Sequence, residues 1–254
     1  MMKNIVLILL FAFNSILAQN NQELFESANA MYKNGQYQEA VKAYEDIIAG
    51  NEISSELFYN LGNSYYKLNK VAPAIFNYEK ALQLDPSNED ANNNLIYAKR
   101  LTIDRIEELP KSVFQRFSSS YLQKMHYNNW GALTIVFAFL AVGLFLLFYF
   151  SLSPFKKRLL FTLSMLSVLF LITSFSIAFH LYRKEKNTKE AIVFSEQVSV
   201  QTEPTNNANE AFVIHEGTKV FVLDAVDDWN KIKLADGKIG WLKNASIKEL
   251  SILF

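Results

Sequence analysis

Residues 28–44 read ANAMYKNGQYQEAVKAY, and residues 62–78 read GNSYYKLNKVAPAIFNY. The second stretch repeats the first at a spacing of 34 residues, and the matched pairs are Ala28 and Gly62, Asn29 and Asn63, Tyr32 and Tyr66, Lys33 and Lys67, Ala40 and Ala74, and Tyr44 and Tyr78. Each stretch has the pattern of a helix, a turn and a second helix, and Gly35 marks the first turn. A repeat of this period predicts an all-α array of stacked helix pairs.

The two units resemble the tetratricopeptide repeat, most clearly in the second unit at Leu61-Gly62, Tyr65, Ala74, Tyr78, Ala81 and Asp85-Pro86. The resemblance implies that one set of residues packs the helices together and binds no ligand: Ala28, Ala40, Tyr44, Gly62, Ala74, Tyr78 and Pro86. A third helix with Asn88 as its cap follows, so that two repeats and a capping helix occupy residues 21–109. Because repeat arrays generally need about three units, we expect this array to lean on the membrane or on a partner.

A second set of residues lies on the first helix of each unit, on the side that the resemblance turns toward the concave surface. It consists of Asn29, Tyr32, Lys33, Tyr59, Asn63, Tyr66 and Lys67. Amides can bond an extended backbone, tyrosines supply flat area and lysines attract carboxylates, so these residues predict a partner-binding groove. The alternative is a solvated face without a ligand. Helix packing does not require asparagine at positions 29 and 63, so we expect their replacement by alanine to leave folding nearly intact.

Two long segments lack charged residues, Trp130 to Phe150 and Leu159 to Leu181. At a rise of about 1.5 Å per residue, each can cross the roughly 30 Å of hydrocarbon in a bilayer. We therefore predict transmembrane helices at residues 130–150 and 159–182, joined by a loop at residues 151–158. Residues 110–129 mix aromatic and polar side chains, which is typical either of an amphipathic segment in contact with membrane lipid or of a plain linker.

Residues 1–18 have the pattern of a secretory signal peptide, because Lys3 precedes a short apolar run that ends near Asn14. An uncleaved anchor is the alternative, and the sequence does not decide whether the segment is removed. Lys156, Lys157 and Arg158 place the loop between the spans in the cytoplasm by the positive-inside rule. Basic residues also flank the outer ends of the spans, so the signal peptide decides the orientation: a bacterial inner-membrane protein with both soluble parts in the periplasm.

Residues 190–254 change to an alternating pattern of short strands, and Asp236-Gly237 is a strong hairpin signal. The order of Glu216-Gly217, Trp229 and Trp241 along this segment resembles the bacterial SH3-like domain. The resemblance implies a small all-β barrel in which Trp229 and Trp241 belong to the core or groove scaffold. We expect this barrel to be a separately stable unit, although a marginal one at about 60 residues.

Catalytic chemistry has no support in the sequence. The three histidines fall in three different segments, and there is no metal motif of paired histidines and no phosphate-binding glycine loop. We therefore predict no enzyme activity, no cofactor and no bound metal. The 25 basic and 25 acidic residues balance, which gives no basic footprint for nucleic acid.

The order of these segments resembles the BatE-type proteins of the bacterial aerotolerance operon. That resemblance implies a multidomain membrane protein that acts as a non-catalytic scaffold in an envelope complex. Its expected partners are other envelope membrane proteins, among them siblings with von Willebrand A domains. The alternative is a cell-wall-targeting module, in which the SH3-like domain binds peptidoglycan and the repeats recruit a wall enzyme.

Overall fold

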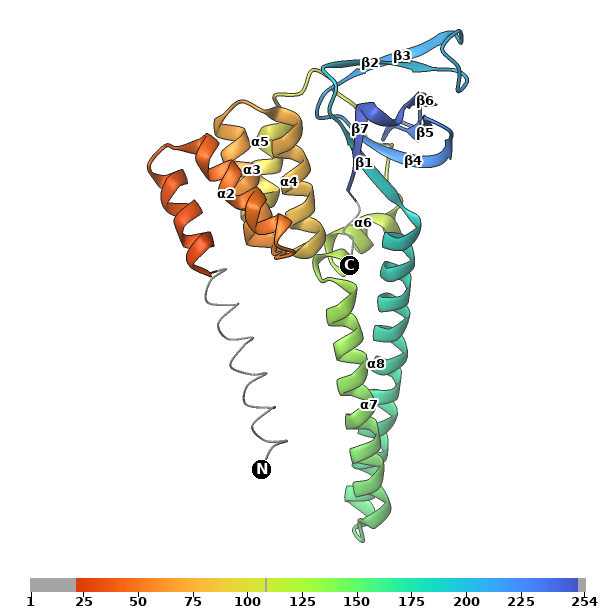
Figure 1. Ribbon diagram of the computed structural model, residues 1–254. Coiled ribbons are helices and arrows are strands. Elements are labelled where there is room, and N and C mark those ends of the chain that lie inside the picture. The colour runs from red at the N-terminus through yellow and green to blue at the C-terminus, as the bar shows by residue number, and fades with distance from the viewer. Residues whose placement is uncertain (1–21, 108, 251–254) are drawn as a thin grey trace, which may run out of the picture. The chain divides into compact units, whose positions relative to one another are not determined.

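The computed structural model describes residues 22–107 and 109–250 (Figure 1). The predicted signal peptide at residues 1–18 lies outside the described residues. The chain divides into two compact units: Met1–Leu109 together with Glu190–Phe254, and Pro110–Lys189. The first unit therefore joins the two ends of the chain, and the second unit is the segment between them.

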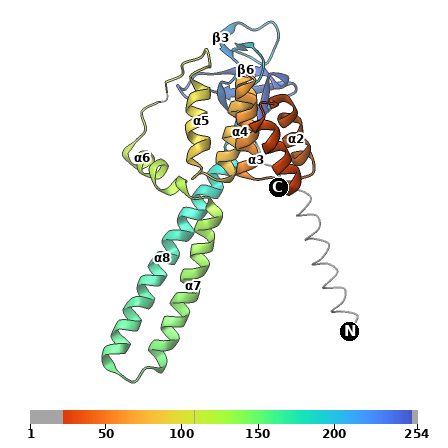
Figure 2. The same ribbon diagram turned by 90° about the vertical axis from the view of Figure 1, so that its left-hand side faces the viewer.

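Five helices form the repeat array of the first unit (Figures 1 and 2): residues 22–33, α2 (Tyr37–Ala49), α3 (Ser55–Lys67), α4 (Val71–Leu84) and α5 (Glu89–Lys99). Side-chain oxygens cap two of the helix starts, because Ser54 accepts from the Leu57 N–H and Asn88 accepts from the Ala91 N–H. Gly35 has φ of 78°, the left-handed conformation that a sharp turn between helices requires. The predicted helix pairs and the Asn88 cap are confirmed.

The predicted packing residues of the array are buried: Ala28, Ala40, Tyr44, Gly62, Ala74 and Tyr78. Gly62 shows why a small residue is needed, since a Cβ atom there would lie 2.8 Å from the Tyr78 ring. Pro86 is half-buried and follows the end of α4. Helical spacing brings these residues to one face of each helix, which explains their shared burial.

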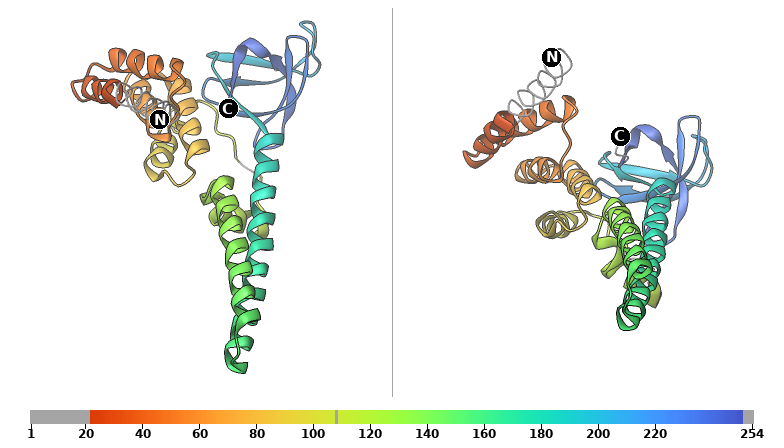
Figure 3. Two further views of the ribbon diagram at one scale, coloured as in Figure 1. Left: turned by 60° about the horizontal axis from the view of Figure 1, so that its bottom comes forward. Right: turned by 90° about the horizontal axis from the view of Figure 1, so that it is seen from below.

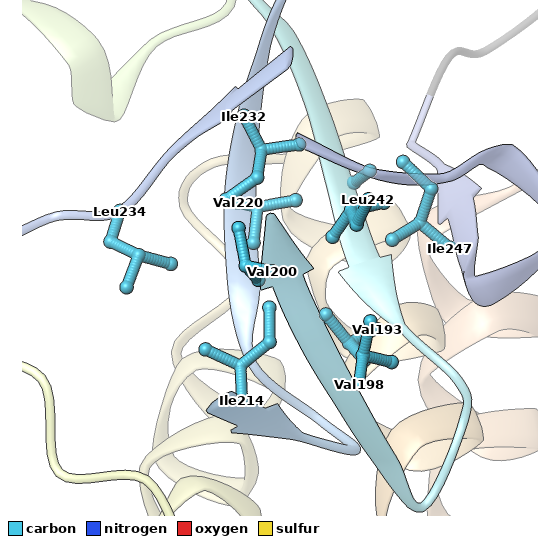
Figure 4. Packing of buried hydrophobic residues seen from close by; sticks show 10 residues of the cluster. Val193, Val198, Val200, Ile214, Val220, Ile232, Leu234, Leu242 and Ile247 are labelled. Atoms are coloured by element: carbon cyan, nitrogen blue, oxygen red, sulfur yellow. The ribbon is translucent and has the colours of Figure 1, made fainter. Parts of the chain in front are cut away.

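The C-terminal part of the first unit is an antiparallel sheet of β1 (Lys189–Val193), β2 (Gln197–Gln201), β3 (Glu210–His215), β4 (Lys219–Val226), β5 (Trp229–Lys233), β6 (Ile239–Lys243) and β7 (Ile247–Glu249). The strand order is β3-β2-β6-β5-β4-β1-β7, and the sheet curls strongly (Figure 3). It surrounds a core of aliphatic residues that includes Val193, Val200, Ile214, Ile232 and Leu242 (Figure 4).

The structure does not confirm the predicted SH3-like barrel. The edge strands β3 and β7 each pair with one neighbour and not with each other, so the sheet is open. The predicted hairpin is present, since β5 pairs with β6 and Gly237 has φ of 96° in the turn between them. What is shown is an antiparallel β domain, and alternation within strands predicts strands without predicting how the sheet closes.

The sheet and the repeats share a hydrophobic cluster. Ile192 and Leu250 are buried against a set of residues from α4 and α5: Ala72, Ala74, Ile75, Tyr78, Leu95 and Ala98. The Phe76 and Phe194 rings meet edge to face, with centroids 5.6 Å apart. The short array therefore buries the apolar side of its last helices against the chain's own β domain.

The second unit contains α6 (Val113–Ser120), the 3₁₀ turn η1 (Leu122–Lys124), α7 (Tyr127–Phe150) and α8 (Pro154–Asn187). The helices α7 and α8 are long and apolar enough to cross a membrane. They pair antiparallel, because Thr134 contacts Ser174 while Ala141 contacts Ser164. The connection between the two helices is short, because α8 begins at Pro154, and proline favours the first helical position, where its missing N–H needs no partner.

Candidate partner-binding face

The predicted groove residues lie on two neighbouring helices of the array. Asn29, Tyr32 and Lys33 come from residues 22–33, and Tyr59, Asn63, Tyr66 and Lys67 come from α3. We call this set the asparagine–tyrosine face. The two helices are joined by a hydrogen bond from Asn60 Nδ2 to Asn29 Oδ1 of 3.0 Å. The structure therefore brings the two predicted groups side by side.

The asparagines of this face form a repeated hydrogen-bond pattern. In the first repeat, Asn29 Oδ1 accepts from the Tyr44 hydroxyl at 2.6 Å as well as from Asn60. In the second repeat, Asn63 Oδ1 accepts from the Tyr78 hydroxyl at 2.7 Å and from Asn94 Nδ2 at 2.8 Å. Each asparagine thus links the tyrosine of its own repeat to the next helix pair.

This pattern corrects the expectation that packing does not require Asn29 and Asn63. Tyr44 and Tyr78 are fully buried, so each hydroxyl needs an acceptor inside the array. The asparagine oxygens supply these acceptors. Across the described residues, the Nδ2 groups of Asn29 and Asn63 donate no hydrogen bond within the chain, so each can still donate to a bound backbone.

The tyrosines of the face gather around Tyr78. Burial raises the pKa of the Tyr78 hydroxyl, and the nearby Tyr59, Tyr32 and Tyr66 hydroxyls raise it further. The Tyr59 and Tyr78 ring centroids are 6.3 Å apart. Tyr32, Tyr59 and Tyr66 are each half-buried, so part of every ring packs on the repeats and part remains open to a ligand.

The two lysines complete the face. Lys33 and Lys67 are both exposed, and each stands in the last turn of its helix. A lysine at this end also interacts favourably with the helix dipole. The face therefore offers donors and positive charge beside aromatic surface, which suits an extended peptide with a carboxylate nearby.

Sequence reasoning missed Asn60 and Asn94 as members of the hydrogen-bond pattern. They are themselves 34 residues apart, so the repeat spacing carried the signal. It also missed the polar contacts between the repeats and the β domain. Those contacts join residues more than 100 positions apart and have no local signal.

The first of these contacts is centred on Glu79 of α4. Its carboxylate lies 2.8 Å from the ammonium groups of both Lys99 and Lys219, and Lys219 also lies 2.7 Å from Glu190. Burial alone would raise the pKa of Glu79, but the charges of Lys219 and Lys99 lower that pKa to about 2. This ion network fastens α4 to strands β1 and β4.

The second contact is made by the segment after α5. Asp104 Oδ2 accepts from the His215 N–H and from the Thr218 hydroxyl, both at 2.6 Å, while Asp104 Oδ1 lies 2.9 Å from His215 Nδ1. Burial opposes charge on Asp104, but the hydrogen bonds from Thr218 and His215 lower its pKa below the ordinary value. Ile106 packs against the core of the β domain, and the Leu109 N–H donates to the Ala235 carbonyl at 3.2 Å.

The tryptophans predicted as barrel scaffold lie on the hairpin of β5 and β6. Trp229 and Trp241 are half-buried and alternate with the buried Asn230, Ile232 and Leu242, so they face away from the aliphatic core. Lys243 and Lys231 lie over the Trp229 and Trp241 rings, each 5.7 Å from the ring centroid. Among the residues that the structure describes, no group of three or more His, Cys, Asp or Glu side chains could hold a metal ion.

The N-terminal geometry defines the class of this part of the chain as a helical-repeat domain. Family models of the tetratricopeptide repeat match residues 24–49 and 55–88, so these two segments are tetratricopeptide repeats. A comparison with curated proteins finds none that matches the chain. Domains of this repeat generally act as non-catalytic scaffolds for protein–protein interaction.

Proposed function

We propose that this chain is a membrane-anchored scaffold whose asparagine–tyrosine face binds an extended segment of a partner protein. The observation that carries the proposal is the pair of open Nδ2 donors on Asn29 and Asn63, flanked by Lys33 and Lys67. Two identical donors at one repeat spacing suit the regular backbone of a peptide. Because the asparagines also serve the fold, the lysines are the better positions for a test.

The location that we propose is the inner membrane of a bacterium, with both soluble parts in the periplasm. Two apolar helices and the signal-peptide pattern at residues 1–18 support this placement. By resemblance to the BatE-type aerotolerance proteins, the proposed partners are other membrane proteins of the envelope, including siblings with von Willebrand A domains. The proposed role is assembly of a stress-related complex.

Site-specific photocrosslinking in the full-length chain tests the proposed face. A benzoylphenylalanine placed at Lys33 or Lys67 should give discrete protein adducts in intact cells, because both side chains lie at the edge of the face. The same probe at Lys42 on α2, also an exposed lysine, is the matched control and should give no common adduct. Adducts from Lys42 alone, or equally from all three positions, would place the partner elsewhere.

The alternative function is wall targeting through the β domain. It is favoured by the half-buried Trp229 and Trp241 with lysines over their rings, since aromatic faces stack on sugars and ammonium groups attract carboxylates. In this alternative the domain binds peptidoglycan and the repeats recruit a wall enzyme. Sedimentation of the purified chain with isolated wall material decides between them, because a scaffold for proteins alone should remain in solution.

A further inference from the structure

Positive charge is concentrated near the start of α7 and the end of α8. Residues 110–129 and 182–189 carry seven basic side chains: Lys111, Arg116, Lys124, Arg183, Lys184, Lys186 and Lys189. Glu185 is the one acidic residue in the same two segments. We call these seven residues the basic collar.

Helix α6 adds an apolar row beside this charge. Ser112 and Gln115 form a capping box that fixes the start of the helix. Val113 and Phe117 lie four residues apart on one side of the helix, and Tyr121 follows as its C-cap residue. Their exposed fractions are 80%, 51% and 67%, so this side of α6 is open. A helix with an open apolar side and basic neighbours is typical of the boundary between lipid headgroups and acyl chains.

Contacts within the second unit hold α6 and the collar at one end of the helical hairpin. The Trp130 indole N–H donates to the Leu122 carbonyl at 3.1 Å, which ties η1 to α7. Lys184 Nζ donates to Gln123 Oε1 at 3.0 Å, which ties α8 to the same turn. The Tyr127 and Tyr182 rings meet edge to face at 5.5 Å. The charges before α7 and at the end of α8 therefore form a single cluster.

We propose that the basic collar binds the headgroups of anionic phospholipids in the adjacent leaflet, while the apolar row of α6 contacts their acyl chains. Charge complementarity supports anionic lipid as the ligand, because these two segments contain seven basic residues and one acidic residue. Continuity with the spans supports it too, since six residues separate the end of α6 at Ser120 from the start of α7 at Tyr127. The inference is independent of the partner proposed for the repeats.

A spin label tests this inference in the full-length chain, which contains no cysteine of its own. Val113→Cys places the label in the apolar row, and Ser119→Cys places a matched label on another side of α6. The probe is a nanodisc of phosphatidylcholine, either alone or with about a third of phosphatidylglycerol. We expect the label at 113, but not at 119, to gain contact with membrane-soluble oxygen when phosphatidylglycerol is present.

Removal of charge separates lipid binding from mere proximity to the bilayer. Lys124→Gln, Lys186→Gln and Lys189→Gln together should abolish this effect at a third of phosphatidylglycerol, because each basic residue near an anionic surface contributes about fivefold in affinity and the three together about a hundredfold. The control removes three exposed lysines outside the second unit, Lys42, Lys70 and Lys238, and should leave the effect unchanged. If the spin label at position 113 lies at the same depth in nanodiscs with and without phosphatidylglycerol, the proposal is overturned. It is also overturned if an acidic protein, but not phosphatidylglycerol, shields this label from water.

Discussion

At the scale of single residues, Asn29 and Asn63 show how one side chain serves both the fold and the proposed binding face. The oxygen of each amide satisfies a buried tyrosine and the asparagine of the next repeat, while the nitrogen stays open. This division follows from the chemistry of the amide, which carries an acceptor and two donors. The same property makes asparagine variants ambiguous reporters of binding.

Asn63→Ala should therefore lower the free energy of unfolding by about 1 to 3 kcal/mol, because the buried Tyr78 hydroxyl loses its acceptor. Thermal unfolding of the full-length chain in detergent, followed by circular dichroism, measures the change. Asn93→Ala, at an exposed position of α5, is the control and should have little effect. Tyr78→Phe in the same background should recover part of the loss; purely additive effects of the two substitutions would refute the proposed pairing.

Glu79 predicts a pH dependence of stability. Its pKa is about 2 in the folded chain against an ordinary value of 4.5, so its contribution is complete above pH 4.5 and is lost as the pH falls toward 2. Glu79→Gln should be less stable than the natural chain by about 3 kcal/mol at pH 7, and this difference should shrink below pH 4.5. Unfolding midpoints across pH 2 to 7 measure it, and Glu39→Gln at an exposed position is the control. A difference that stays constant with pH would contradict the assignment.

At the scale of elements, the two long helices are held together by small polar side chains in an otherwise apolar pair. Thr134 Oγ1 donates to Ser174 Oγ at 3.0 Å, and Ser164 Oγ donates to the Ala141 carbonyl at 3.0 Å. Small residues let helix backbones approach closely where water is excluded. These contacts give Ser164 and Ser174 a role in the pairing of α7 with α8.

A disulfide tests this pairing, because the chain has no cysteine to interfere. Thr134→Cys with Ser174→Cys should crosslink under mild oxidation, so that cleavage at a protease site inserted beside Leu152 leaves the halves joined. Leu152 is 97% exposed, which makes the loop accessible to the protease in detergent. Phe139→Cys with Phe175→Cys, both on exposed sides of their helices, should separate after the same treatment. Crosslinking of the second pair alone would require another register.

At the scale of the whole molecule, the repeats and the β domain form one body although the long helices separate them in the chain. Ile106 completes the aliphatic core of the sheet, while Ile192 and Leu250 complete the cluster of the repeats. That residues 190–254 fold alone stays a prediction, but we now expect that fragment to be less stable than the same residues in the full chain. Removal of these contacts would expose apolar area on both sides.

In the proposed membrane topology, this shared body requires its two halves to lie on the same side of the membrane. Single cysteines at Lys42 and Asn206, both exposed, should react alike with an impermeant maleimide in intact spheroplasts. In the proposed orientation both are labelled, whereas a cysteine at Lys157 between the spans is protected. Labelling of only one of the two soluble positions would show that the body does not assemble across the hairpin.

Local patterns in the sequence were enough to predict the helices of the repeats, the two apolar helices and the strands of the C-terminal domain. Each of these depends on neighbours within a few positions: the helical spacing of Ala40 and Tyr44, the Asn88 cap, or the turn at Gly237. The 34-residue repeat also placed Asn29 and Asn63 on one face. It could not show that their oxygens are already used by Tyr44 and Tyr78.

Only the tertiary structure decided that the sheet stays open, that Glu79 is buried between two lysines, and that Asp104 and Ile106 belong to the β domain as much as to the repeats. These contacts join residues 111 to 140 positions apart. Interactions over such separations arise when whole elements pack, and they leave no period or spacing in the chain. The sequence therefore predicts the helices and strands of this protein, whereas the packing of the repeats against the β domain is decided only by the tertiary structure.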